Sequence, residues 1–310
     1  MGTSWSVTYG ETGGEPGPQE ISRLIAERLE AVNASMSTYR QDSELMQFNQ
    51  SAVSESIVLS TDLQTVLGAA LHVGEASGGA YDVTIAPLVD LWGFGPDGPA
   101  QGVPSDDQIE ARMSSVGQQY LQLGEAGAIS KSQAVQVDLS SIAKGFGVDA
   151  VAQVLEDSGI TDYLAEVGGE MRLAGLSPRG DDWRVAIESP EPGQRSVALA
   201  FSATNIAVAT SGDYRNFYEV DGVRYSHSID ARSGRPVRHD LVSVTVLHKS
   251  AMWADAWATA LTILGSEAAL SLAYQRGLAV YLIRRDQDAL VVEYSSGFVP
   301  YLPDEQPASQ

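Results

Sequence analysis

The sequence predicts an α+β protein in which helices pack on largely antiparallel sheets. Apolar residues recur at helical spacing near the start of the chain, whereas short strand-like runs dominate its second half. These runs are joined by short turns, and not by the long crossover connections that parallel strands need. The 310 residues, 44% of them hydrophobic, suffice for one large domain with a buried core.

The first half should contain a strand and three helices. We expect an amphipathic helix at Glu20–Met36, because its apolar residues form one stripe and its charges fall outside it. Another helix should begin at Ser105, where the sequence has the form of a capping box with acids in the first turn. The other segments expected here are a strand at Ser4–Tyr9, loops at Gly10–Pro18 and Gly93–Asp107, and a helix at Thr61–Ala76.

The second half contains a strong hairpin signal at Val220–Val223, since its central Asp-Gly pair suits a type I′ turn. Ala134–Leu139 resembles a strand that leads into a helix at Ile142–Asp157. We expect one domain over residues 1–302, with two intimately packed α+β subdomains as the alternative, and a frayed tail at 303–310. The remaining expected elements are strands at Tyr163–Val167, Trp183–Glu188, Ser196–Phe201, Phe217–Val220 and Leu241–Leu247, helices at Ala251–Leu264 and Ser266–Arg276, and a hairpin of Ala279–Arg284 with Leu290–Tyr294.

Composition excludes several classes of function. The net charge of −21 repels nucleic acids and anionic membrane surfaces, so a phosphate-bearing substrate would need a metal or a local cation. The absence of cysteine excludes disulfides, thiolate nucleophiles and cysteine-bound metals. No apolar run reaches the roughly 20 residues of a membrane span. Gly93–Gly98 matches a dinucleotide-binding pattern by letter, but Pro96 and Pro99 block the helix which that site requires.

One polar cluster lies at Val137–Gly145, where a strand-like run ends in Asp138 and passes through two serines into a helix. Free N–H groups at a helix start favour anions, and Lys144 adds a positive charge. The alternative is that Asp138, Ser140 or Ser141 simply caps the helix.

A second cluster lies inside an otherwise apolar helix. Asp255 and Thr259 are four residues apart, so both project from one face and offer the oxygen ligands that Mg²⁺ prefers. The alternative is structural: Asp255 would interact with the helix dipole in the first turn, and Thr259 would bond to a carbonyl one turn earlier.

A third cluster comprises Thr210–Asn216 and Ser226–Asp230. His227 in the second segment is a candidate for proton transfer, because a neutral imidazole accepts a hydroxyl proton near pH 7. A histidine that only pairs with Asp230 is the alternative. Gly168-Gly169-Glu170 suggests either a bulge or a close approach of the backbone to a ligand.

These motifs occur together in the order seen in the FAD:protein FMN transferase (ApbE) family, which the chain resembles from Met1 to about Leu282. The segments that carry the resemblance are Met1–Thr3, Met36–Arg40, Tyr81–Thr84, Leu91–Gly95, Asp138–Gly145, Gly168–Glu170, Thr210–Asn216, Ser226–Asp230 and Ala254–Leu261.

The resemblance implies an ApbE-like, T-fold-like architecture and a Mg²⁺-dependent enzyme. Such an enzyme cleaves the pyrophosphate of FAD, attaches FMN to a Thr or Ser of an acceptor protein and releases AMP. Family members are usually exported and modify subunits of membrane redox complexes. We therefore expect a periplasmic protein with an export signal or lipid anchor upstream of Met1.

The resemblance also assigns residues. His227 would be the base that deprotonates the acceptor hydroxyl. The metal would be held by Asp255, Thr259 and the backbone oxygen of Ser141, and Ala258 stands where some members have another acid. The FAD-binding residues would be Met1, Tyr39, Ala80, Tyr81, Asp82, Asp138, Lys144, Arg215 and Ile229.

Three other functions compete with transfer. An FAD pyrophosphatase would use water in place of the acceptor, but the hydrolytic type has Asn where this chain has Tyr39. A non-catalytic FAD-binding protein would leave bound FAD unchanged. An unrelated structural domain would bind no FAD.

Overall fold

The centre of the fold is an antiparallel sheet, as the sequence predicts. The computed structural model describes residues 2–10, 16–95, 98, 102–191, 196–212, 217–287 and 289–303. Within them, seven strands pair in the order β1-β5-β6-β9-β14-β15-β16, and each neighbouring pair is antiparallel. The strands are β1 (Trp5–Tyr9), β5 (Tyr163–Val167), β6 (Glu170–Ala174), β9 (Ile206–Gly212), β14 (Leu241–His248), β15 (Ala279–Asp286) and β16 (Ala289–Tyr294).

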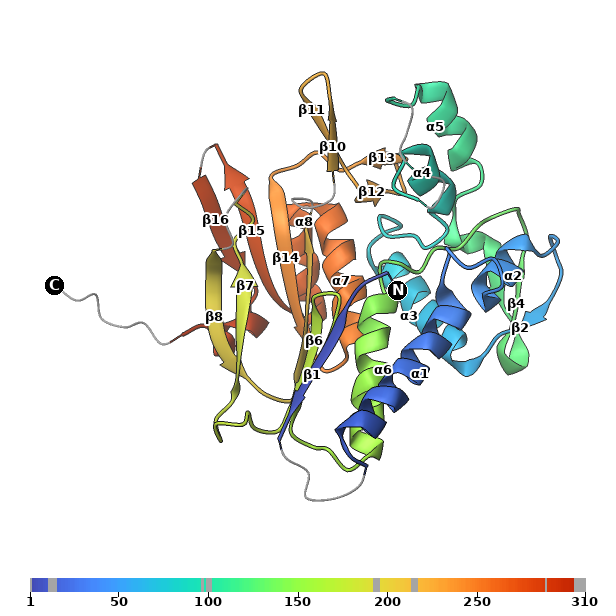
Figure 1. Ribbon diagram of the computed structural model, residues 1–310. Helices are drawn as coiled ribbons and strands as arrows, with labels where there is room; N and C mark the ends of the chain where they lie inside the picture. The colour runs from blue at the N-terminus through green and yellow to red at the C-terminus, as the bar shows by residue number, and fades with distance from the viewer. Residues whose placement is uncertain are drawn as a thin grey trace.

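Different elements cover the two faces of this sheet (Figure 1). Helices lie on one face, where α7 contacts β9 and β14, and α6 contacts β5 and β6. A separate hairpin and a 3₁₀ helix cover the other face through an apolar cluster that includes Trp183 and Phe298. The helices are α1 (Pro18–Met36), α3 (Thr61–Ala76), α6 (Ala143–Asp157), α7 (Ala251–Leu264) and α8 (Ser266–Arg276); the opposite layer is β7 (Trp183–Glu188), β8 (Val197–Ala203) and η3 (Ser296–Tyr301).

Two groups of small elements complete the fold (Figure 1). One group lies beyond α1 and α3 and contains α2 (Glu44–Gln50), β2 (Ile57–Val58), η1 (Gln118–Tyr120), β3 (Leu121–Leu123), η2 (Glu125–Gly127) and β4 (Ala128–Lys131). The other lies at the upper end in Figure 1 and contains α4 (Ala86–Leu91), α5 (Asp106–Met113), β10 (Phe217–Val220), β11 (Val223–Ser226), β12 (Ile229–Asp230) and β13 (Arg235–Pro236).

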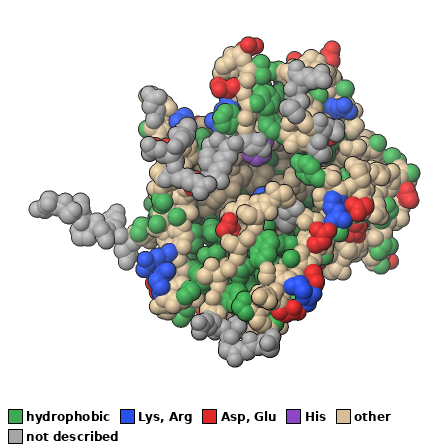
Figure 2. All heavy atoms as spheres, viewed as in Figure 1, with side chains coloured by type: hydrophobic (Ala, Val, Ile, Leu, Met, Phe, Trp, Pro, Cys, Tyr) green, Lys and Arg blue, Asp and Glu red, His purple; other side chains and the backbone are tan. Residues whose placement is uncertain are grey.

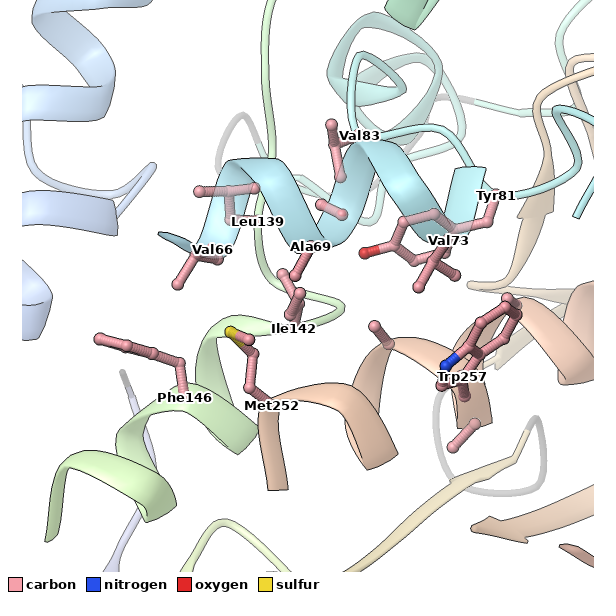
Figure 3. Close-up of a cluster of buried hydrophobic side chains, with 14 of the residues drawn as sticks. Val66, Ala69, Val73, Tyr81, Val83, Leu139, Ile142, Phe146, Met252 and Trp257 are labelled. Atoms are coloured by element: carbon pink, nitrogen blue, oxygen red, sulfur yellow. The ribbon is translucent and has the colours of Figure 1, made fainter. Parts of the chain in front are cut away.

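The apolar core fixes the position of the segment that precedes α6. In Figure 3 the side chains of Ile142 and Phe146 lie between α3 and the start of α7, beside Met252, and Leu139 belongs to the same buried cluster. Leu139 and Ile142 are fully buried. Because these apolar residues anchor the segment, the polar residues between them are held against α7.

Local signals in the sequence are confirmed by the structure. The side chain of Ser105 accepts from the backbone of Gln108, and the Gln108 side chain accepts in return, which completes the capping box of α5. Asp221 and Gly222 have φ values of 51° and 74°, as a type I′ turn requires. The helices predicted at Thr61–Ala76, Ala251–Leu264 and Ser266–Arg276 have those bounds.

The strand predicted at Ala134–Leu139 is wrong. This segment forms only an isolated bridge between Gln136 and Ile85. Its backbone groups bond elsewhere: the Asn49 side chain pairs with both backbone groups of Val137, and the Asp138 amide donates to Val83. The Asn49 side chain and the Val83 carbonyl therefore satisfy backbone groups of an extended segment that alternates like a strand.

Within the described parts of the chain, no helix is both long and apolar enough to cross a membrane.

Candidate active site

The three predicted metal ligands lie at the junction of α6 and α7. The Thr259 hydroxyl is 3.5 Å from the backbone oxygen of Ser141. Asp255, one turn earlier on α7, is 3% exposed, and its Oδ2 accepts a 2.9 Å hydrogen bond from the Gly145 amide. The structure therefore brings together residues that are more than a hundred positions apart in the chain.

These donors fit a hard cation. A carboxylate, a hydroxyl and a peptide carbonyl are all oxygen ligands, and adjacent ligands of an octahedral Mg²⁺ lie about 3 Å apart. The 3.5 Å between Thr259 Oγ1 and the Ser141 oxygen is close to that separation. Among the described residues, no group of three or more His, Cys, Asp or Glu could hold a metal ion, so a site here needs these neutral oxygens.

The structure contradicts the capping alternatives for both segments. The N-cap of α6 is Ile142, which makes no side-chain cap, so neither Asp138 nor the two serines cap this helix. Helix α7 is capped by Ser250 and has no acid in its first turn, which leaves Asp255 in the helix interior. The partners of this buried acid come instead from the first turn of α6, where the Gly145 amide donates to Oδ2 and Lys144 lies beside Oδ1.

Lys144 lies between two buried carboxylates. Its Nζ is 2.6 Å from Glu170 Oε1 and 3.3 Å from Asp255 Oδ1. Burial raises the pKa of Glu170 to about 7, and the Lys144 charge offsets part of that effect. Burial also raises the pKa of Asp255. Burial alone would lower the pKa of Lys144, but the two carboxylates raise it above its ordinary value. The ammonium therefore stays charged within this cluster.

Asp138 and Tyr81 shape the loop before α6. Asp138 Oδ1 accepts a 2.7 Å hydrogen bond from the Ser140 amide, which turns the chain toward Ser141. The Ser141 hydroxyl is 2.8 Å from the hydroxyl of Tyr81, whose ring is buried. Tyr81 therefore supports the loop and presents no open ring face, unlike Tyr39, which is 73% exposed.

The other predicted FAD-binding residues lie in different surroundings. Ala80 and Ile229 are both buried. The amide of Ala231, two residues after Ile229, donates to the Ala80 carbonyl, so the two segments lie side by side. The carboxylate of Asp82 accepts from Thr84 and from the Gln118 amide, so its oxygens already have partners. Met1 and Arg215 lie outside the described residues.

His227 lies at the upper end of the molecule, between β11 and β12. The Ser228 amide donates to the Ser226 hydroxyl across it, so the chain turns at the histidine. Its half-buried ring lies edge-on to Phe94, with ring centroids 6.3 Å apart. Strand β12, which follows, contacts α7. Figure 2 shows a hollowed area on this side of the molecule, with a histidine side chain at its edge.

Gly145 permits the close contact between α6 and α7. A Cβ at this position would lie 2.2 Å from the Ala251 carbonyl oxygen and 2.7 Å from Asp255 Cβ. Neither atom can move aside, because the first belongs to the backbone of α7 and the second is attached directly to it. The identity of this residue therefore sets the distance from the Ser141 loop to Asp255.

We expect Gly145→Ala to lower the free energy of unfolding by about 2–3 kcal/mol, because the added methyl forces the two helices apart. Chemical denaturation measures the change. Gly68→Ala in α3 is the matched control, since a Cβ there meets nothing within 4 Å and should stabilise the helix by up to about 1 kcal/mol. Equal unfolding midpoints for the two variants would contradict this explanation.

The fold places the protein among solved flavin transferases. It matches the flavin transferase ApbE from Vibrio cholerae with a TM-score of 0.91 and 44% identity, covering 97% of this chain and 96% of that one. The Pseudomonas stutzeri flavinyl transferase ApbE, in its apo form, matches with a TM-score of 0.90 and 36% identity over 97% and 94% of the two chains.

The chain belongs to the ApbE family, whose model matches residues 1–282. It is 45% identical to an FAD:protein FMN transferase of Vibrio cholerae, covering 97% of this chain and 90% of the relative. It is 42% identical to the enzyme of that name from Haemophilus influenzae, covering 96% and 88%. The resemblance predicted from the motifs is thus confirmed, and so is the α+β class.

Proposed function

We infer that the protein is an FAD:protein FMN transferase. The observation that carries this conclusion is its 45% identity, over nearly the full length of both chains, to a transferase of that name. The structure supports it by gathering Ser141, Asp255 and Thr259, while Lys144 adds a cation that can face a diphosphate. FAD and an acceptor protein are then the two substrates.

In the reaction that we propose, the acceptor hydroxyl oxygen forms a bond to the phosphorus of the FMN half of FAD. The bond from that phosphorus to the bridging oxygen breaks, and AMP leaves with that oxygen. His227 takes the proton of the hydroxyl. Mg²⁺ held by Asp255, Thr259 and the Ser141 carbonyl would neutralise charge on the phosphates.

The direct test mixes the protein with FAD, Mg²⁺ and a candidate acceptor, and then detects flavin fluorescence on the denatured acceptor. We expect a labelled acceptor and one AMP for each label. Removal of the metal with EDTA should abolish the labelling, and added Mg²⁺ should restore it. AMP release without a label on any acceptor would favour the pyrophosphatase, and intact FAD would favour a non-catalytic binding protein.

Tyr39 is proposed as a wall for one of the flat rings of FAD, because its side chain is 73% exposed although it is aromatic. We expect Tyr39→Asn to weaken FAD binding about tenfold, since stacking on an aromatic ring contributes about 1–3 kcal/mol. Quenching of flavin fluorescence measures the affinity. The matched control is Tyr274→Asn on α8, another exposed tyrosine, which should leave the affinity unchanged. Equal affinities for the two variants would exclude Tyr39 from the site.

We also propose that the protein works in the periplasm and that its acceptor is a subunit of a membrane redox complex. The family resemblance supports this proposal. Cell fractionation of the native organism, followed by in-gel flavin fluorescence of its membrane proteins with and without this gene, would test it. Protein found only in the cytosolic fraction would contradict the proposed location.

A further inference from the structure

Glu170 lies at the start of β6, directly after the turn that connects it to β5. Gly168 and Gly169 form this turn with φ values of 64° and 100°, and Val167 pairs with Glu170 across it. A Cβ on Gly168 would lie 3.2 Å from Lys144 Cδ, so the turn closely approaches the lysine stem. The two-glycine turn therefore brings the Glu170 carboxylate to the end of the Lys144 side chain.

Both oxygens of Glu170 have partners, which fixes the carboxylate. Oε1 is 2.6 Å from Lys144 Nζ, and Oε2 accepts a 3.2 Å hydrogen bond from the Thr210 amide on β9. Glu170 is only 4% exposed. A buried, doubly bonded carboxylate has little freedom to move, so it is a firm anchor for a flexible lysine.

Asp255 is placed so that a metal ion and Lys144 compete for it. Its Oδ2 accepts from the Gly145 amide, and its Oδ1 is 3.3 Å from Lys144 Nζ. Lys144 Nζ lies closer to Glu170 Oε1, at 2.6 Å, than to Asp255 Oδ1, at 3.3 Å. Lys144 Nζ is also 3.5 Å from Asp255 Oδ2, so the lysine makes one short contact with Glu170 and two longer contacts with Asp255.

We propose that Glu170 is a positioning residue for the metal site: it makes the shorter contact with Lys144 and so retains the ammonium when a cation displaces it from Asp255 Oδ1. This inference rests on the proposed metal-dependent function. Without the Glu170 charge, Asp255 is the one carboxylate of this pair left to the ammonium, which then competes more strongly with a divalent cation for it by charge and by occupancy.

The test measures Mn²⁺ affinity by the electron paramagnetic resonance signal of the free ion, with saturating FAD and no acceptor. Glu170→Gln should weaken Mn²⁺ binding about tenfold, because it removes a charge-assisted hydrogen bond to the lysine. Adding Lys144→Met to this variant should restore the affinity to near the wild-type value, since no ammonium then competes. If Glu170 only stabilised the fold, adding Lys144→Met would not restore the Mn²⁺ affinity.

Two control variants test whether the effect on Mn²⁺ binding depends on the position of Glu170 and on its charge. Glu166→Gln makes the same chemical change on the neighbouring strand, where Glu166 accepts from Ser6, and should bind Mn²⁺ like wild type. Glu170→Asp keeps the charge and should lose less affinity than Glu170→Gln. If wild-type protein binds no Mn²⁺, both the metal site and this inference are wrong. If it binds Mn²⁺ and Glu170→Gln binds equally well, only the inference is wrong.

Discussion

Replacing His227 with alanine should slow FMN transfer about 10²–10⁴-fold, the usual contribution of a general base. The acceptor hydroxyl is a poor nucleophile until it loses its proton, and the imidazole is the group that we propose to accept it. FAD binding should change little, because Asp255, Thr259 and Lys144 lie on other elements. Single-turnover transfer to an excess of acceptor measures the rate, and flavin fluorescence measures the affinity.

His227→Gln serves as a second variant. Glutamine keeps the approximate size of the side chain and can donate or accept a hydrogen bond, but it cannot take a proton at neutral pH. It should therefore be as slow as the alanine variant if the proton is what matters. A glutamine variant that transfers FMN at the wild-type rate would show that His227 only shapes the site beside Phe94.

The sequence predicted elements well where local signals agreed with the tertiary environment. Helix α7 has a serine N-cap and an almost wholly apolar body, and both of its bounds were predicted. The turn at Asp221-Gly222 was equally clear, because its backbone conformation depends on those two residues alone. Local chemistry decides such elements before any packing occurs.

The errors come from contacts that are distant in the sequence. Ala134–Leu139 alternates like a strand, but Asn49, far earlier in the chain, takes its hydrogen bonds. Strand β9 was not predicted, although it lies at the centre of the sheet between β6 and β14. It begins Ile-Ala-Val-Ala, a short apolar run whose periodicity does not distinguish a strand from a buried helix.

In the candidate site, too, local patterns predicted some residues, whereas contacts distant in the sequence determine others. Spacing within one helix placed Asp255 and Thr259 on a common face, and the structure brings Ser141 to them. Glu170 was noted only as part of a Gly-Gly-Glu turn, and no local pattern indicates that this turn meets Lys144. The two glycines were the available signal, since adjacent glycines with positive φ mark a close approach of backbone and side chain.

Asp255→Asn should abolish metal-dependent transfer without weakening the fold. Loss of the charged ligand removes several kcal/mol of charge stabilisation, so we expect transfer to fall at least about a thousandfold. Asparagine keeps an oxygen for the Gly145 amide, and Lys144 keeps Glu170 as its partner. Transfer assays across a range of Mg²⁺ concentrations measure the loss, and activity that excess Mg²⁺ fully restores would indicate that other ligands hold the metal.

The Asp255→Asn substitution should not lower the stability of the folded protein in the absence of metal. Because burial raises the pKa of Asp255, the folded protein binds this proton more tightly than the unfolded chain does. Ionisation of Asp255 therefore opposes folding, and the stability present at low pH is lost as the pH rises through the folded-state pKa. In EDTA at neutral pH, the Asp255→Asn variant should melt at the wild-type temperature or above it. A clearly lower melting temperature would mean that Asp255 is retained for its contacts with Lys144 and Gly145 and not for a metal ion.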